Sequence, residues 1–391
     1  MYKYSQRLPW DVSSNSLTGL LRAKRLACVP LLDLTVSNPT EAFADYPHQA
    51  IQDAYAHVDD FTYKPDPFGQ EQARSAIAEL YGRRGIAISP DRLVLTASTS
   101  EAYALLFKLF GDPESEILAP APSYPLFEYL AALESLRIVP YRLVYDGAWS
   151  IDWANLREQI SPRTRAIVIV NPNNPTGSFL KRWEAEELFQ IAQQHELPII
   201  SDEVFLDYSF GESGDKQKTL IGSQSILSFS LDGLSKTAVM PQMKLGWIAI
   251  NGPEEQVEIA RARFELLLDT YLSVSTPVQC AAPELLHIGA EFQHKVAART
   301  KRNLKSLSRC LHNTPAHALH TEGGWSVIVQ LPRTHSEETW VSRLLEEQGV
   351  IVQPGYFFDM ASEAYVVLSL ITPPEIFDEG IVRLRSLACA P

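Results

Sequence analysis

The chain has 391 residues, 46% hydrophobic and 21% charged, a composition that excludes disordered and fibrous classes and predicts one large and one smaller folded domain. Its formal net charge of −13 argues against a nucleic acid partner. The apolar runs are far shorter than the ~20 residues of a membrane-spanning helix, and the N-terminus lacks a secretory signal, so we expect no membrane contact and a cytoplasmic location.

Residues 1–45 are expected to form an irregular N-terminal arm that contains one short helix at 16–26. In residues 46–285, short apolar runs alternate with helical patterns, which is typical of an α/β domain with a mostly parallel sheet covered by helices on both faces. Two helices of this domain have apolar residues at helical spacing, around 73–81 and 102–109. The expected strands are 92–95, 116–119, 166–170, 198–201, 226–229 and 245–250.

Residues 286–391 show a different pattern and are expected to form a small α+β domain, tightly joined to the large one. Its expected helices are a polar, basic one at 291–309 and two more at 337–348 and 374–388. Its expected strands are 325–331 and 365–370.

Three successive strand ends in the large domain carry polar residues suited to cofactor chemistry. The strand at 166–170 runs into the turn 171–177 (NPNNPTG), which contains Asn174, the next strand ends at Asp202, and the strand after it leads to Lys236. Ligands bind at the carboxyl edge of a parallel sheet. An aldehyde cofactor needs a lysine for a Schiff base, a carboxylate to keep a pyridine nitrogen protonated, and a donor to its phenolic oxygen. Lys236, Asp202 and Asn174 match these three roles.

With these motifs, nearly the whole chain resembles a class I/II pyridoxal-phosphate-dependent aminotransferase of the aspartate aminotransferase fold, fold type I. The resemblance implies that Lys236 forms the internal aldimine with pyridoxal 5'-phosphate and shuttles the substrate proton. It also implies that Asp202 pairs with the pyridinium and that Asn174 donates to the ring hydroxyl. The segment 96–102 resembles the phosphate loop of the family, where a helix N-terminus meets the phosphate. Its implied phosphate ligands are Ser98, Thr99 and Ser100.

Three further site residues are implied by the resemblance alone. Tyr124, in the segment 121–125 (APSYP), is the candidate for the aromatic ring that stacks on the pyridine. Tyr63 resembles the tyrosine that reaches the phosphate of a neighbouring subunit, which implies a homodimer with shared active sites. Asn38, in the segment 37–40 (SNPT), resembles a loop residue that contacts substrate, although an ordinary Asn-Pro turn explains it equally well.

The sequence departs from the family pattern around the cofactor. Lys244 stands where an arginine usually grips the phosphate, and it lacks the two-point fork of a guanidinium. Gly233 stands where a serine or threonine often contacts the phosphate. Phe205 replaces a tyrosine that usually donates to the ring oxygen, so we expect a higher aldimine pKa than in a Phe205→Tyr variant.

A further departure concerns the substrate. Val367 occupies the place of the arginine that forks onto the substrate α-carboxylate. A hydrogen bond to a charged group contributes roughly 1.5 to 3 kcal/mol, so its absence should weaken the binding of ordinary amino acids. Arg383 and Arg385 are expected on the exposed side of the last helix, and Lys64 is a speculative substitute for the missing cation. The substrate class is therefore open.

The function that these features favour is transfer of an amino group between an amino donor and a 2-oxo acid. A lyase or decarboxylase on the same fold is the alternative, because one aldimine can lose a proton, a carboxylate or a β-substituent. A cofactor-sensing effector domain is disfavoured by the lack of a basic helix-turn-helix segment, and a nicotinamide oxidoreductase by the lack of a GxGxxG motif. The four cysteines lie far apart, so no metal site is expected.

Overall fold

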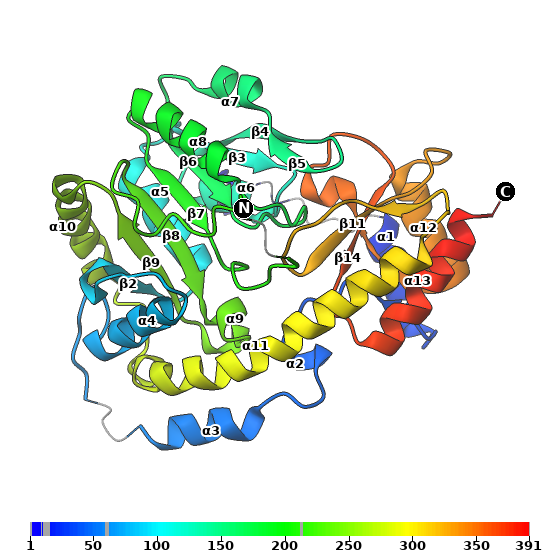
Figure 1. The fold of residues 1–391 in the computed structure, drawn as a ribbon, viewed down its shortest axis with the longest axis horizontal. Helices are drawn as coiled ribbons and strands as arrows, with labels where there is room; N and C mark the ends of the chain where they lie inside the picture. Colours follow the sequence, from blue (N-terminus) through cyan, green and yellow to red (C-terminus); the bar gives the residue numbers. More distant parts are fainter. Residues whose placement is uncertain (1, 9, 11–15, 59–61, 212–213, 391) are drawn as a thin grey trace.

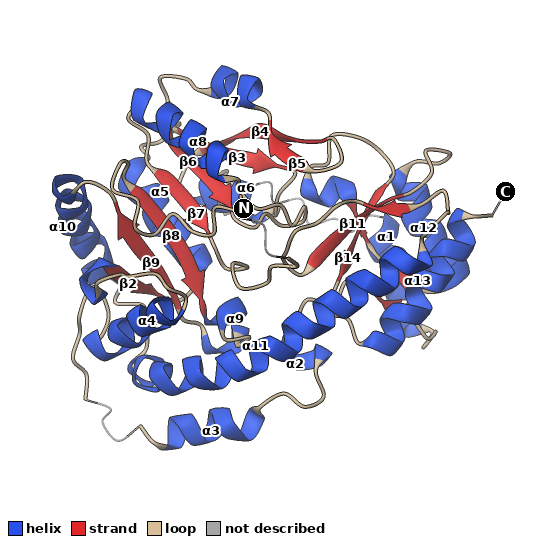
Figure 2. Ribbon diagram, in the orientation of Figure 1, coloured by secondary structure: helices blue, strands red, loops and turns tan. Residues whose placement is uncertain are grey.

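The computed structural model describes residues 2–8, 10, 16–58, 62–211 and 214–390, and it divides into a large α/β part and a smaller α+β part (Figure 1). The large part is built on an eight-stranded sheet, and the smaller part on a four-stranded sheet (Figure 2). The long helix α11 (Thr276–Cys310) runs along both parts, from α9 (Leu234–Thr237) to α13 (Pro374–Ala388).

The eight-stranded sheet is mostly parallel. Its β6–β7, β7–β8, β3–β6 and β3–β4 pairs are parallel, whereas β9 is antiparallel to both of its neighbours and β5 is antiparallel to β4. The strands follow one another across the sheet in the order β2 (Leu93–Thr96), β9 (Gly246–Asn251), β8 (Ser228–Gly233), β7 (Ile199–Asp202), β6 (Thr164–Val170), β3 (Glu116–Ala121), β4 (Arg137–Tyr145) and β5 (Trp149–Ile151).

Helices cover both faces of this sheet because its central strands are buried on both sides. Successive residues of a strand point to opposite faces, so Val168 packs with α5 and α10 on one face while Ile167 and Ile169 pack with α8 on the other. On the first face lie α5 (Thr99–Phe110), α6 (Leu126–Leu133) and α10 (Glu254–Tyr271). On the second lie α4 (Glu71–Arg83), α7 (Trp153–Gln159), α8 (Arg182–Gln194) and the first turns of α11.

The smaller part packs its own apolar core between its sheet and helices. Val327 and Val329 of one strand and Val366 and Leu368 of another face Leu344 and other helical residues. The sheet order is β10 (His317–Ala318), β11 (Ser326–Gln330), β14 (Tyr365–Ser369) and β13 (Gln353–Pro354). The flanking elements are α1 (Ser16–Leu26), α12 (Glu337–Gln348), α13 and the small pair β1 (Leu32–Asp33) and β12 (Val350–Ile351).

The N-terminal arm joins the two parts. After β1 it forms α2 (Pro39–Ala42) and α3 (His48–Ala56), and α3 packs on α11 below the large part in Figure 1. Ser369 on β14 holds the arm through two hydrogen bonds, from its N–H to Leu34 O at 2.7 Å and from its Oγ to Val36 O at 2.5 Å. This part of the arm is therefore fixed to β14 of the smaller part.

The predicted fold class is confirmed, and all six predicted strands of the large part are present to within two residues at their starts and four at their ends. The sequence did not predict β4 and β5. In β4 most residues are exposed or half-buried, so it does not form the apolar run that marks a buried strand. The expected boundary between residues 285 and 286 lies inside the continuous helix α11, so the two parts share an element. The division into domains remains an expectation.

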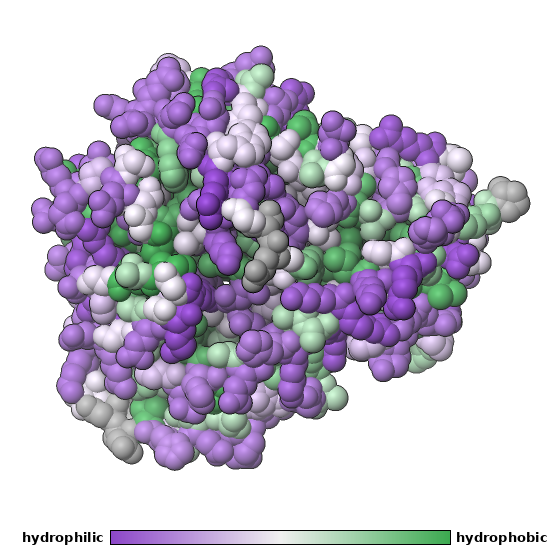
Figure 3. All heavy atoms as spheres, viewed as in Figure 1, coloured by the Kyte–Doolittle hydropathy of each residue, from purple (hydrophilic) through white to green (hydrophobic). Residues whose placement is uncertain are grey.

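The face of the molecule drawn in Figure 3 is mainly hydrophilic, with hydrophobic residues in small separate patches. Within the described ranges, no helix combines the length and the apolar character that crossing a bilayer requires.

Candidate active site

The carboxyl ends of β6, β7 and β8 lie side by side and carry the three segments that the sequence singles out. In the sheet register, Val170 pairs with Asp202, and Asp202 pairs with Leu231. Beyond them, Gly233 pairs with Gly246 of β9, which in turn pairs with Thr96 of β2. The sheet therefore brings Asn174, Asp202, Lys236 and the loop before α5 to one edge.

Lys236 lies on the one-turn helix α9, directly after β8. Its Nζ lies 4.5 Å from the ring centroid of Trp325 and 5.6 Å from that of Phe205. Burial lowers the pKa of Lys236 to about 8, while the negative charge of Asp202 acts in the opposite direction. At neutral pH about a tenth of Lys236 is therefore the free amine, the form that reacts with a carbonyl carbon, whereas an ordinary lysine has far less.

Asp202 ends β7 with its carboxylate held in place on both oxygens. Oδ1 accepts a hydrogen bond from Val204 N at 3.3 Å, and Oδ2 accepts one from the hydroxyl of Tyr103 at 3.0 Å. Burial raises the pKa of Asp202 to about 6, and these hydrogen bonds together with the charge of Lys236 limit the rise. The carboxylate is ionised at neutral pH and is available to a positively charged partner.

Asn174 lies in the turn that connects β6 to α8. The turn is compact because Asn173 accepts hydrogen bonds from Thr176, and because Gly177 adopts φ of +68°. A Cβ on Gly177 would lie 1.8 Å from Thr321 Oγ1, so only glycine fits there. Asn174 Oδ1 accepts a hydrogen bond from Ser326 Oγ at 3.1 Å, which leaves the Nδ2 donor of Asn174 for another acceptor.

Ser98, Thr99 and Ser100 form the start of α5, with Ser98 as N-cap and its Oγ accepting from Glu101 N. The first intrahelical bond runs from Ala102 N to Ser98 O at 3.0 Å, so the N–H groups of Thr99 and Ser100 precede it and point out of the helix end. A Cβ on Gly246 would lie 3.0 Å from the carbonyl carbon of Ser98. The absence of a side chain there lets β9 and the N-terminal end of α5 pack closely.

Gly233, where the resemblance leads one to expect a hydroxyl residue, is wholly enclosed. A Cβ on Gly233 would lie 3.0 Å from Gly246 Cα and 3.0 Å from Leu245 O. A serine side chain would clash with Gly246 and Leu245, so the close pairing of β8 and β9 explains why glycine occupies this position. Lys244 is exposed and adopts a left-handed backbone conformation with φ of +53°.

The remaining predicted site residues lie nearer the surface. Tyr124 follows β3 and is 48% exposed. Tyr63 is 70% exposed and lines a groove together with Gly69 and Leu95. Asn38 caps α2 through hydrogen bonds from Thr40, and it lines a shallow depression together with Gln242.

Val367, on β14, is part of an apolar cluster. It is 1% exposed and packs with Trp149, Leu319, Ile328 and Phe358. This position therefore offers no charge to a substrate carboxylate. The other cations named as possible substitutes do not lie at this position. Arg383 of α13 donates to Glu379 on the same helix and to Gln348 O at the end of α12. Arg385 and Lys64 are exposed.

The sequence reasoning missed two residues that shape the site. Tyr103 lies on the buried face of α5, and a buried tyrosine hydroxyl usually has a partner, but nothing in the sequence identifies Asp202 as that partner. Trp325 follows two glycines directly before β11, and its ring packs edge-on against Phe205 at 5.5 Å and Tyr208 at 5.1 Å. It contributes an aromatic wall from the smaller part beside Lys236.

The charges and the hydrogen-bonding groups of these residues match those of pyridoxal phosphate. A weakly basic lysine, a buried carboxylate stabilised by Tyr103, an amide donor and a helix N-terminus lie along one sheet edge. They match the aldehyde, the pyridine nitrogen, the phenolic oxygen and the phosphate of this cofactor. Lys236, Asp202, Asn174 and the start of α5 would hold it.

Three proteins with a related sequence or structure are named as aminotransferases. The glutamate-pyruvate aminotransferase AlaA of Escherichia coli (strain K12) is 30% identical over 64% of this chain, and the match spans 62% of its own length, less than two thirds. Nicotianamine aminotransferase 1 of Oryza sativa subsp. japonica is 27% identical over 91% of this chain and 74% of its own length. The alanine aminotransferase structure from Pyrococcus furiosus has 25% identity and a TM-score of 0.87 over 99% of both chains.

The fold of the alanine aminotransferase thus covers nearly the whole chain. The sequence model of the family aminotransferase class I and II matches residues 30–376, a range that includes the three strand-end segments and the start of α5. Members of the family depend on pyridoxal phosphate. The chain therefore belongs to the aminotransferase class I and II family.

Proposed function

We propose that this protein is a pyridoxal-phosphate-dependent aminotransferase that transfers an amino group between a small amino donor and a 2-oxo acid, with Lys236 as the catalytic lysine. The observation that carries the proposal is the pairing of a Lys236 amine, whose pKa burial lowers to about 8, with the Asp202 carboxylate at the same sheet edge. Family membership and the names of the relatives support the same reaction class.

Each residue has a distinct task in this mechanism. Lys236 Nζ, a fraction of which is unprotonated at neutral pH, would accept the proton from the substrate Cα and deliver it to the C4′ carbon of the cofactor. Asp202, held by Tyr103, would keep the pyridine nitrogen protonated. When bound, pyridoxal phosphate supplies an electron sink for the negative charge at Cα. The rings of Trp325 and Phe205 exclude water from the amine.

Binding of the cofactor would rely on Asn174 and the start of α5. Ser326 Oγ donates to Asn174 Oδ1, so the Nδ2 donor of Asn174 would be available to the ring oxygen of the cofactor. The N–H groups and hydroxyls of Ser98, Thr99 and Ser100 would bind the phosphate at the positive end of the helix dipole. Tyr124 would stack on the ring, and Lys244 would add a positive charge.

The active site is proposed to be completed by a second subunit. Tyr63 is 70% exposed at a groove that also includes Leu95, immediately before the loop that leads to α5. A large aromatic side chain that is exposed in this way is available to a second copy of the chain, which supports a homodimer in which Tyr63 of one protomer binds the phosphate of the other. A molar mass measurement by light scattering tests this, and a monomer with full cofactor affinity would contradict it. The cytoplasmic location and the contact of Asn38 with substrate remain predictions.

The part of the substrate that carries an α-carboxylate in ordinary amino acids is proposed to meet apolar rather than charged surroundings near β14. The cluster around Val367 gives no positive charge for an α-carboxylate at that position. A panel of amino donors should therefore include amines that lack a carboxylate alongside alanine, glutamate and tyrosine.

The experiment that tests the function combines binding and turnover. The purified protein is incubated with pyridoxal phosphate, an amino donor and a 2-oxo acid, and the products are identified by mass spectrometry. The proposal expects an amino group on the former 2-oxo acid. Release of ammonia or carbon dioxide in its place would identify the lyase or decarboxylase alternative. The Lys236→Ala variant is the control and should form neither product.

A further inference from the structure

A buried network of charged side chains surrounds the segment that carries Lys236. Asp232, at the end of β8, is 0% exposed. Its Oδ1 accepts hydrogen bonds from Gly233 N and from Thr237 Oγ1, both at 2.7 Å. One carboxylate oxygen thus connects the residue that precedes α9 to the last residue of α9, and it fixes the turn on which Lys236 lies.

Arg84 reaches the same segment from another element. It caps the C-terminus of α4, and its side chain is 13% exposed. One terminal nitrogen donates to Asp232 Oδ2 at 3.2 Å, while the other donates to Asp207 and to Thr237 Oγ1. Burial lowers the pKa of Arg84, but the negative charges of Asp207 and Asp232 have a larger combined effect, so the net result is a raised pKa. A planar guanidinium spans these acceptors, whereas a lysine ammonium reaches fewer of them at once.

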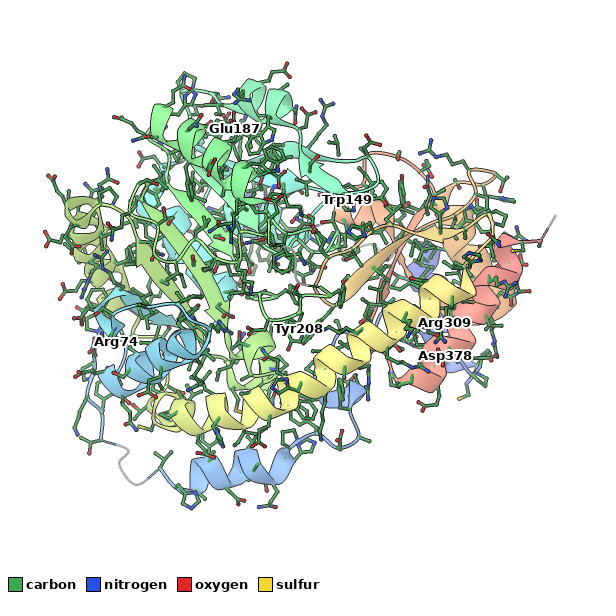
Figure 4. All side chains as sticks on the ribbon, in the orientation of Figure 1. Arg74, Trp149, Glu187, Tyr208, Arg309 and Asp378 are labelled. Carbon is green, nitrogen blue, oxygen red and sulfur yellow. The ribbon has the colours of Figure 1, made fainter. Side chains whose placement is uncertain are left out.

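Side chains from two further elements hold the main chain at Lys236 itself. The hydroxyl of Tyr208, which Figure 4 shows near the centre of the molecule, donates to Lys236 O at 2.7 Å. Gln293 of α11 donates to Thr237 O at 3.2 Å and to Asp207 at 2.7 Å. The backbone of Lys236 is thus fixed from α4, from the loop after β7 and from α11.

We propose that Arg84 and Asp232 are positioning residues that hold the Lys236 segment in place, so that the amine stays enclosed between Trp325, Phe205 and Asp202. This inference rests on the proposed function of Lys236. Both act on the segment and not on the amine: Asp232 accepts from Gly233 N and Thr237 Oγ1, and Arg84 donates to Thr237 Oγ1 and to Asp232.

Fold stability alone is a poor explanation for such a network. Two carboxylates and a guanidinium lose much of their hydration when they are buried, and well-packed apolar residues are often equally stabilising in their place. Apolar contacts do not fix the orientation of a helix as short as the four residues of α9, because they have no preferred direction. The hydrogen bonds of Asp232 and Arg84 do have one, and they connect to α9 and to the residues before it, which indicates that they fix its orientation.

The consequence is measurable at the Lys236 amine. Its pKa is about 8 because it is enclosed, against 10.5 for an ordinary lysine. If the segment is released, the amine gains access to water and its pKa rises toward the ordinary value. A rise of one unit lowers the free-amine fraction at neutral pH by about tenfold.

The test uses the apoprotein, so it needs neither cofactor nor turnover. Lys236 is acylated with a small amine reagent over a range of pH, and the modified peptide is quantified by mass spectrometry. Arg84→Lys and Asp232→Asn are compared with Arg74→Lys, a matched control on the same helix. Arg74 is also buried and donates to Gly69 O and Pro90 O, and Figure 4 shows it away from Tyr208.

The expected result is that both test variants react at least about tenfold more slowly at neutral pH and have a midpoint at least about one unit higher. The control should keep the midpoint of the wild type even if it loses stability. Folded test variants with an unchanged midpoint would overturn the proposal and leave only a structural role.

If either variant does not fold, the Thr237→Val variant is measured in its place. Valine has the shape of threonine but cannot donate the hydrogen bond to Asp232, and the same criterion applies. Lack of aminotransferase activity would not affect this outcome, so failure of the proposed function is distinguished from failure of this inference.

Discussion

The hydrogen bond from Tyr103 to Asp202 gives the most quantitative prediction. Tyr103 is 3% exposed, and its hydroxyl is 3.0 Å from Asp202 Oδ2. In a Tyr103→Phe variant the charged carboxylate loses a donor that contributes roughly 1.5 to 3 kcal/mol. This corresponds to a rise of about one to two units in the pKa of Asp202, from about 6 to about 7 or 8.

The sign of the effect on stability follows from this shift. The pKa of Asp202 in the folded protein lies above its ordinary value of 3.8, so stability is lost as the pH rises through the folded pKa. Loss of the Tyr103 donor makes that loss larger. The variant should therefore be destabilised by roughly 1.5 to 3 kcal/mol at about pH 8.5, where Asp202 is charged, and by clearly less at about pH 5.

Urea unfolding of the apoprotein at the two pH values measures this difference. The matched control is Tyr141→Phe, because the Tyr141 hydroxyl is also buried but donates to the neutral Val168 O at 2.9 Å. Its effect on the free energy of unfolding should be the same at both pH values. Equal destabilisation of the Tyr103→Phe variant at both pH values would refute the reasoning.

Three further predictions concern the same site. Asp202→Asn removes the negative charge that raises the pKa of Lys236, so the acylation midpoint of the apoprotein should fall below about 8, and a rise would contradict this. Phe205→Tyr adds a donor near the cofactor, so the pH midpoint of the bound cofactor's absorbance change should decrease, and an identical midpoint would disprove the expectation. Gly177→Ala places a Cβ against Thr321 at φ of +68°, which should lower the free energy of unfolding by at least about 2 kcal/mol in urea titrations, whereas an unchanged value would rule out the strain.

The sequence allowed prediction of features that depend on order along the chain. Asp202 and Lys236 were placed together because each follows a strand directly, and parallel strands end at one edge. The start of α5 was recognisable because its cap and apolar spacing are local. The roles assigned to these residues remain proposals.

Features that depend on contacts between distant segments were not predictable in the same way. Tyr103 and Asp202 are 99 positions apart, and Arg84 and Asp232 are 148 positions apart. No periodicity or spacing connects such pairs, since they meet only after the sheet has formed. The strand β4, next to the edge strand β5, is also not predictable, because its exposed residues interrupt the apolar run by which a buried strand is recognised.

The assignment of Lys236 as the cofactor lysine is tested most directly by locating the cofactor. The protein is saturated with pyridoxal phosphate, treated with borohydride, digested and examined by peptide mass spectrometry. We predict that the pyridoxyl group is found on Lys236. A label on another lysine, or a Lys236→Ala variant that retains the same covalent label elsewhere at full yield, would contradict the account.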